Sequence, residues 1–126
     1  MKKLLFIVNP AAGQRKILRH LGDVISLFNQ SGFEVTVYMT SAPGDGKRLA
    51  RDHAGRFDLV VCAGGDGTLN EVISGILEAG AEVSVGYLPC GSTNDFAATL
   101  GLPGNVMAAA RVIVEGEAQA LDVGAF

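Results

Sequence analysis

The sequence predicts an α/β domain whose sheet is doubly wound and mostly parallel, with helices on both faces. Apolar runs rich in β-branched residues alternate along the chain with segments in which apolar residues recur at helical spacing. One of these runs is almost wholly apolar, as expected of a strand whose sheet is covered on both faces. Alternating strands and helices are the pattern that builds a parallel sheet. The 126 residues fit one domain, residues 1–126.

The first half of the chain is expected to form two strands and two helices. Residues 3–8 are an apolar run that suits a buried strand and is too short for the apolar core of a signal peptide. The following helix ends at Gly32. Its apolar face consists of Ile17, Leu18, Leu21, Val24, Ile25 and Phe28. Apolar and polar residues alternate over residues 33–40, which predicts a second strand, and a second helix is expected over residues 41–53.

The second half repeats this alternation. Residues 57–63 form the almost wholly apolar run and are expected to be the third strand. A glycine-rich loop follows, and then an amphipathic helix that ends at Gly80. The remaining expected elements are a strand at residues 83–88, a short helix at 94–100, a longer helix at 106–114 and a final strand at 118–126.

Composition excludes several classes of function. The net charge of −3 argues against a nucleic-acid binder that relies on a basic surface, and this segment carries no polybasic membrane anchor. No apolar stretch approaches transmembrane length. The two cysteines, Cys62 and Cys90, have no neighbours that suit a metal site, so they are interpreted as small core residues in a reducing compartment. A cytoplasmic protein is therefore expected.

Small polar residues and glycines gather in the loops that follow the predicted strands. In a parallel sheet these loops lie at one edge, where ligands of such folds bind. The four loop segments are Asn9-Pro10-Ala11-Ala12-Gly13, Thr40, Gly64-Gly65-Asp66-Gly67-Thr68, and Pro89-Cys90-Gly91-Ser92-Thr93-Asn94-Asp95.

The third loop has the residues of a phosphate site. Its glycines allow the backbone to approach an anion closely, and a helix expected to begin near Thr68 adds free N–H groups. An acidic side chain beside phosphate requires a shared cation, so Asp66 indicates Mg²⁺. Alternatively, Thr68 and Glu71 form a T-x-x-E capping box and Asp66 lies in a tight turn. The two interpretations are compatible, because a capped helix can still bind phosphate.

The fourth loop allows the same two interpretations. Ser92 to Asp95 has the S-x-x-D spacing of a second capping box. In the functional interpretation, Ser92 or Thr93 donates a hydrogen bond to a phosphate or ribose, and Asp95 joins a metal-linked network.

In combination, these loops resemble the catalytic domain of the diacylglycerol kinase family, specifically its bacterial lipid kinases. The resemblance covers the whole chain in order. It rests on Asn9-Pro10-Ala11-Ala12-Gly13, Thr40, Gly64-Gly65-Asp66-Gly67-Thr68-Leu69-Asn70-Glu71-Val72 and Leu88-Pro89-Cys90-Gly91-Ser92-Thr93-Asn94-Asp95-Phe96-Ala97. One departure is Gly91-Ser92, where the family usually has Gly-Thr; the hydroxyl is retained.

The resemblance implies ATP-dependent transfer of the γ-phosphoryl group to a lipid hydroxyl such as that of diacylglycerol. It also implies the fold of the amino-terminal domain of NAD kinases and diacylglycerol kinases. The residues it assigns to ATP are Asn9, Pro10, Ala11, Ala12, Gly13, Thr40, Gly64, Gly65, Asp66, Gly67, Thr68, Leu69, Asn70, Glu71 and Ser92. The residues it links indirectly to Mg²⁺ are Asp66, Asp95 and Asp122.

Members of this family carry a second, β-rich domain with the lipid site, further Mg²⁺ ligands and a carboxylate that acts as general base. The resemblance therefore implies that this chain is the nucleotide-binding domain of a longer kinase that meets its lipid at a membrane surface. We expect no catalytic residue in this chain and little or no activity from it alone. Its apolar last strand, if left unpaired, favours association of two copies.

Two alternatives stay open. A related kinase with the same glycine-rich loop, such as an NAD or sphingosine kinase, shares the third motif, although Asn94-Asp95-Phe96-Ala97 favours the diacylglycerol type. A nucleotide-binding module without enzymatic activity is the other.

Overall fold

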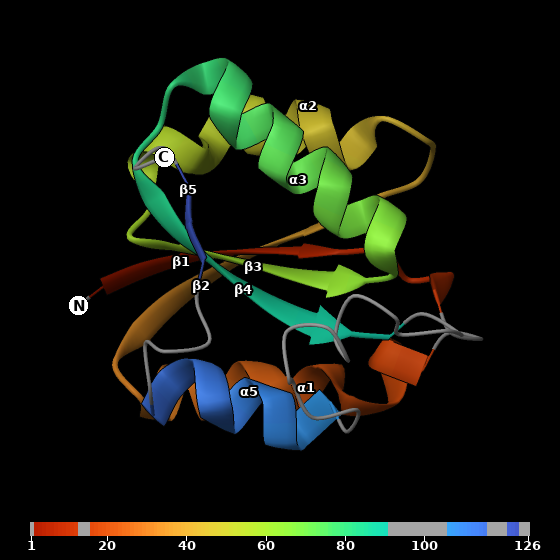
Figure 1. The fold of residues 1–126 in the computed structure, drawn as a ribbon. Coiled ribbons are helices and arrows are strands. Elements are labelled where there is room, and N and C mark those ends of the chain that lie inside the picture. Colours follow the sequence, from red (N-terminus) through yellow and green to blue (C-terminus); the bar gives the residue numbers. More distant parts are fainter. Residues whose placement is uncertain (1, 13–15, 91–105, 116–120, 124–126) are drawn as a thin grey trace.

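A five-stranded sheet with helices on both faces forms the computed structural model of the chain, which describes residues 2–12, 16–90, 106–115 and 121–123 (Figure 1). The strands lie in the order β2-β1-β3-β4-β5. The strands are β1 (Lys2–Val8), β2 (Phe33–Met39), β3 (Leu59–Gly64), β4 (Val83–Pro89) and β5 (Leu121–Val123). The helices are α1 (Lys16–Gln30), α2 (Asp45–His53), the short 3₁₀ helix η2 (Ala54–Arg56), α3 (Asp66–Ala79) and α5 (Val106–Glu115).

Four of the strands, β1 to β4, are parallel, and their carboxyl ends meet at one edge of the sheet. There, Val8 pairs with both Met39 and Ala63. By contrast, β5 is antiparallel and pairs with the first half of β4, so the sheet is mostly parallel, as predicted. The described part of the final strand is shorter than expected, and the short helix predicted at residues 94–100 lies outside the described residues.

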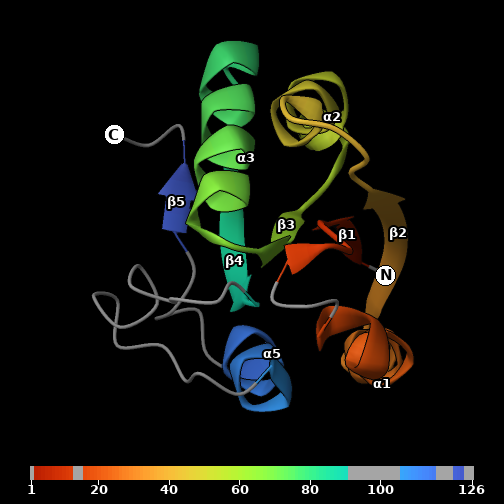
Figure 2. The same ribbon diagram turned by 90° about the vertical axis from the view of Figure 1, so that its right-hand side faces the viewer.

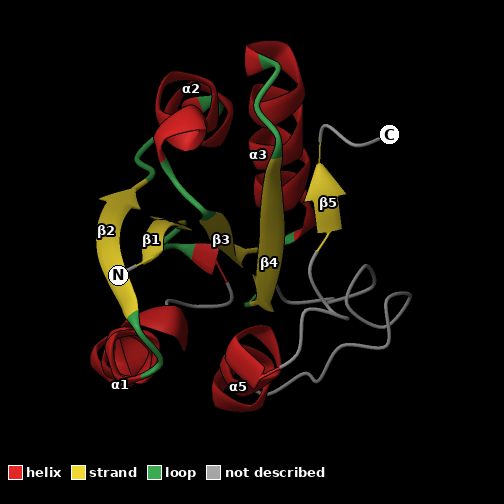
Figure 3. Ribbon diagram, turned by 90° about the vertical axis from the view of Figure 1, so that its left-hand side faces the viewer, coloured by secondary structure: helices red, strands yellow, loops and turns green. Residues whose placement is uncertain are grey.

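The helices cover the sheet in two layers, α1 and α5 on one face and α2 and α3 on the other (Figures 2 and 3). Successive side chains of a strand point to opposite faces, and in β1 both sets are fully buried from Leu4 to Val8. Leu4 and Phe6 pack against α1, whereas Leu5 and Ile7 pack toward α2 and α3. This double burial explains why β3 and the part of β1 from Leu4 to Val8 carry no polar side chains.

Two helices begin at other residues than the sequence suggested. The helix expected from residue 41 begins at Asp45. Gly44 has a left-handed backbone (φ 92°), which an α-helix cannot include, so residues 41–43 stay outside the helix. The helix expected near Thr68 begins two residues earlier, at Asp66. Both starts lie at the edge of the sheet where the parallel strands end.

Helices α2 and α3 pack closely at Gly75. A Cβ atom at this position would lie 2.2 Å from the carbonyl oxygen of Lys47 and 2.9 Å from the Cβ of Ala50. The absent side chain therefore allows the two helix backbones to approach each other. Within the described ranges, the helices are too short or too polar to span a bilayer.

Candidate functional site

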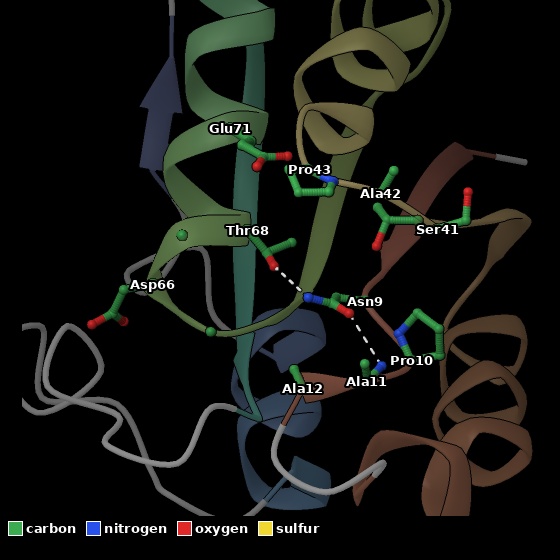
Figure 4. Close-up of a pocket in the computed structure, with 13 residues that line it drawn as sticks. Asn9, Pro10, Ala11, Ala12, Ser41, Ala42, Pro43, Asp66, Thr68 and Glu71 are labelled. Carbon is green, nitrogen blue, oxygen red and sulfur yellow. Dashed lines mark hydrogen bonds between the residues drawn. The ribbon is translucent and has the colours of Figure 1, made fainter.

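A cavity of about 880 Å³ opens at the carboxyl edge of the sheet (Figure 4). Its volume lies within the usual range of small-molecule sites, about 300–1,000 Å³. Three segments line it: the loop after β1, the loop after β2 and the first turns of α3. Its lining residues are Asn9, Pro10, Ala11, Ala12, Thr40, Ser41, Ala42, Pro43, Gly65, Asp66, Gly67, Thr68 and Glu71.

Asn9 holds the first wall against α3. Its backbone N–H donates to the carbonyl of Ala63 (2.8 Å), which continues the pairing of β1 with β3. The side-chain Oδ1 accepts a hydrogen bond from the N–H of Ala11 (3.1 Å), and Nδ2 donates to the hydroxyl of Thr68 (3.3 Å; Figure 4). An asparagine that closes its own turn and reaches a second segment ties the loop and the helix together.

The amino terminus of α3 forms the second wall. Gly65 caps it with an extended backbone and no side-chain hydrogen bond, and the first turn closes when the N–H of Leu69 donates to the carbonyl of Gly65 (3.2 Å). The N–H groups of Asp66, Gly67 and Thr68 therefore have no partner within the helix. Such groups at a positive helix terminus attract an anion.

The capping box between Thr68 and Glu71 is not formed, so that alternative is wrong. It requires Thr68 to precede the helix, whereas α3 begins at Asp66. The carboxylate of Glu71 instead reaches α2, where its oxygens accept hydrogen bonds from the N–H groups of Gly44 (3.2 Å) and Gly46 (3.1 Å).

The third wall follows β2 and is closed by Asp45. One carboxylate oxygen of Asp45 accepts hydrogen bonds from the N–H of Ser41 (2.8 Å), the hydroxyl of Ser41 (3.0 Å) and the N–H of Ala42 (3.0 Å). These donors, first the Ser41 backbone, hold the pKa of the Asp45 carboxyl below its ordinary value. Asp45 thus shapes the lining segment 41–43 without lining the cavity itself.

The end of β3 beneath the cavity is tightly packed at Gly64. Its carbonyl accepts hydrogen bonds from the N–H of Cys90 (2.9 Å) and the hydroxyl of Tyr87 (3.2 Å). A Cβ atom on Gly64 would lie 2.6 Å from the hydroxyl oxygen of Thr68. Only glycine therefore leaves room for Thr68 in its observed position.

Asp66 is fixed by Tyr87, whose hydroxyl lies 3.2 Å from Asp66 Oδ1. The Asp66 side chain points away from Asn9 and Thr68 (Figure 4). Among the described residues there is no group of three or more His, Cys, Asp or Glu side chains that could hold a metal. A single carboxylate still suits Mg²⁺, which usually keeps several waters and is held by one or two carboxylates together with substrate phosphates.

Tyr87 makes the stability of the fold depend on pH in the alkaline range. Burial, and then the charge of Asp66, raises the pKa of the Tyr87 hydroxyl above its ordinary value near 10. Folding favours the neutral form of the Tyr87 hydroxyl. The stabilisation that this preference gives to the folded state is therefore complete below pH 10 and is lost as the pH rises above 10. The buried Cys62 thiol, whose pKa burial also raises, acts in the same direction.

Tyr87→Phe is therefore expected to flatten the decline in unfolding free energy above pH 10 by up to about 1.4 kcal/mol per pH unit. It is also expected to cost about 1 kcal/mol at pH 7, because one hydrogen-bond donor is removed. Urea unfolding of both proteins at several pH values between 7 and 11 measures both effects. Equal slopes for the two proteins would contradict the raised Tyr87 pKa.

The structure places most predicted ligand residues around one cavity. Those that line it are Asn9, Pro10, Ala11, Ala12, Thr40, Gly65, Asp66, Gly67, Thr68 and Glu71. Gly64 lies in the strand beneath, the side chain of Leu69 is fully buried in the core, and Asn70 is exposed on α3. Asp122 pairs with Ser84 in the first half of β4, so the sheet does not bring its backbone to this edge. Gly13, Ser92 and Asp95 lie outside the described residues.

Sequence reasoning missed Tyr87 and the cavity-lining segment 41–43. The signal for the segment was Gly44 next to Asp45, a turn glycine followed by an acidic residue that can cap the preceding chain. The Tyr87 contact left no local signal, because it depends on the pairing of β3 with β4.

Comparisons with known proteins point to one family. The profile of the diacylglycerol kinase catalytic domain matches residues 3–126. The diacylglycerol kinase of Bacillus subtilis (strain 168) is 39% identical over 126 residues, covering 98% of this chain and 42% of that protein. The diacylglycerol kinase of Staphylococcus saprophyticus is 41% identical over 124 residues, covering 98% of this chain and 41% of that protein. This chain therefore spans less than half the length of these relatives.

The fold is likewise similar to that of a diacylglycerol kinase. A crystal structure of a diacylglycerol kinase from Bacillus anthracis str. Sterne matches with a TM-score of 0.82 and 32% sequence identity. The match covers 90% of this chain and 42% of that chain. The predicted α/β fold class is confirmed by this likeness and by the observed sheet.

Proposed function

Because the chain belongs to the diacylglycerol kinase catalytic domain family, we propose that it is the ATP-binding part of a lipid kinase. The reaction is transfer of the γ-phosphoryl group of ATP to a lipid hydroxyl such as that of diacylglycerol. The observation that supports the proposal most is the free amino terminus of α3, which opens into a cavity of ligand size.

The phosphates bind at the start of α3. The backbone N–H groups from Asp66 to Thr68 lack intrahelical partners and lie at the positive end of the helix, where a phosphate chain is stabilised. Asn9 holds the loop after β1 beside them through its hydrogen bond to Thr68. The nucleoside then extends over the segment from Thr40 to Pro43, which forms the remaining wall. Ser92 donates a further hydrogen bond to the nucleotide.

Asp66 would hold Mg²⁺ together with the phosphates, and Asp95 would belong to the same polar network. When bound, the ion neutralises charge on the transferring phosphoryl group. The Tyr87 hydroxyl, 3.2 Å from Asp66 Oδ1, restricts the orientation of this carboxylate. The indirect metal role of Asp122 stays a prediction, and its backbone pairs with that of Ser84 in the first half of β4.

Phosphoryl transfer also needs a group that orients the acceptor hydroxyl. The cavity offers two carboxylates, Asp66 and Glu71, and Glu71 is already hydrogen-bonded to α2. We therefore assign the base and the lipid site to the remaining length of such kinases, which meets the lipid at a membrane surface. On this proposal the chain alone binds ATP and has little or no kinase activity.

Calorimetric titration with ATP tests the proposal. Saturable binding that weakens at least tenfold when Mg²⁺ is removed, or in Asp66→Ala with Mg²⁺ present, is the expected result. Asp58→Ala is the matched control, because Asp58 accepts a hydrogen bond from the N–H of Lys3 at the opposite edge of the sheet. A folded chain that shows no binding at millimolar ATP would contradict ATP binding by this domain.

A further inference from the structure

Glu71 joins α3 to the amino terminus of α2 across the cavity. Its Oε2 lies 3.2 Å from the N–H nitrogen of Gly44, and its Oε1 lies 3.1 Å from that of Gly46. One donor, Gly44, is the N-cap residue of α2 and offers no side-chain hydrogen bond; the other, Gly46, lies in the first turn of this helix. Glu71 therefore supplies the missing cap of α2 from a different helix, and its negative charge suits the positive end of that helix.

The contact between Glu71 and α2 depends on the absence of a side chain at Gly46. A Cβ atom on this buried residue would lie 3.0 Å from Glu71 Oε1 and 3.2 Å from Glu71 Cβ. Glycine has a lower helix propensity than alanine, and this makes a helix less stable by about 1 kcal/mol. Here it leaves the space through which the Glu71 carboxylate reaches the backbone.

The capped helix end is continuous with the cavity wall. Gly44 directly follows Pro43, and the Asp45 carboxylate binds the N–H groups of Ser41 and Ala42. The segment 41–43, the first turn of α2 and Glu71 are thus linked by consecutive hydrogen bonds.

We propose that Glu71 is a positioning residue for the nucleotide: its carboxylate sets the separation between the α3 phosphate site and the wall formed by residues 41–43. This inference rests on the proposed ATP binding. Each carboxylate oxygen accepts one hydrogen bond from α2, and the proposed role is exercised through these two bonds and not through a direct contact with ATP. Glu71 acts on ATP through the wall that it holds.

Glu71→Ala removes both acceptors, and we expect at least tenfold weaker ATP binding in calorimetry. We also expect at least tenfold faster hydrogen exchange of the Gly46 amide without nucleotide. Glu71→Gln keeps the length of the side chain but presents an amide NH₂ to one of the two donors, so its affinity falls between those of wild type and Glu71→Ala.

Glu78→Ala is the matched control. Glu78 also links α3 to α2, through Lys47 (3.1 Å) and Arg51 (3.5 Å), but it is half-exposed and does not line the cavity. Its removal is expected to change ATP affinity less than twofold. Thermal unfolding confirms that each variant is folded.

Titrations with 2′-deoxy- and 3′-deoxy-ATP separate positioning from ribose contact. For a positioning residue, the affinity ratio of ATP to each analogue is the same in wild type and Glu71→Ala. If the substitution abolishes a wild-type preference for ATP, Glu71 contacts the ribose and the inference is overturned. It is also overturned if wild type binds ATP and Glu71→Ala binds it equally well. Absence of wild-type binding instead overturns the proposed function, and this inference with it.

Discussion

Gly75→Ala is expected to destabilise the fold by about 3 kcal/mol, the upper part of the usual range for overpacked sites. The added Cβ atom would lie 2.2 Å from the carbonyl oxygen of Lys47 and 2.9 Å from the backbone nitrogen of Arg51. These are backbone atoms of α2, so no side-chain rotation relieves the contact and the helices must separate. Urea denaturation followed by circular dichroism measures the loss.

Gly22→Ala is the control for this prediction. Gly22 is exposed in the middle of α1, and no atom lies within 4 Å of a Cβ placed there. Alanine is favoured over glycine in a helix interior, so this variant is expected to gain up to about 1 kcal/mol. If both substitutions stabilise the protein, that result contradicts the close approach of α2 and α3 at Gly75.

Gly64→Ala is expected to weaken ATP binding at least tenfold. Its Cβ atom would lie 2.6 Å from the Thr68 hydroxyl oxygen and 2.8 Å from the Thr68 Cβ. Thr68 has to move, and with it go the first turn of α3 and the hydrogen bond from Asn9. The substitution therefore disturbs two of the three walls of the cavity. Calorimetric titration with ATP and Mg²⁺ gives the change in affinity.

The comparison for this variant is Gly55→Ala. Gly55 lies in η2, before β3 rather than after it, and a Cβ atom there meets nothing within 4 Å. Its affinity for ATP is expected to equal that of wild type. An unchanged affinity in Gly64→Ala as well would mean that Thr68 is not held in place for the nucleotide.

The strands and helix faces were predictable because buried positions carry apolar residues, and these form recognisable patterns within each segment. Strand β3 and residues 4–8 of β1 are buried on both faces, so their sequences are apolar and identify them as strands without reference to neighbouring segments. Helix starts were less predictable. The cap of α3 is Gly65, which uses its extended backbone and no side-chain hydrogen bond, and such a cap resembles any other loop glycine. Thr68 and Glu71 carried the stronger capping signal and misled the prediction.

The site was predictable where its residues are neighbours in sequence. The loop after β1 and the glycine-rich loop are each contiguous, and a parallel sheet brings them to one edge. Long-range contacts were not predictable. The hydrogen bonds of Glu71 span 27 and 25 residues, and they exist because α2 approaches α3 closely at Gly75. The hydroxyl of Tyr87 reaches Asp66 across 21 residues because β4 happens to pair beside β3.

The strand order also has a consequence for how the chain folds during synthesis. The first of the described strands in chain order, β1, lies inside the sheet, and β2 and β3 each pair with it. Strand β4 then pairs with β3, and β5 with β4. Each of the described strands after β1 thus finds a partner strand that is already translated. Since translation adds about 5–20 residues per second, the sheet can grow outward from its first strand at the pace of the ribosome.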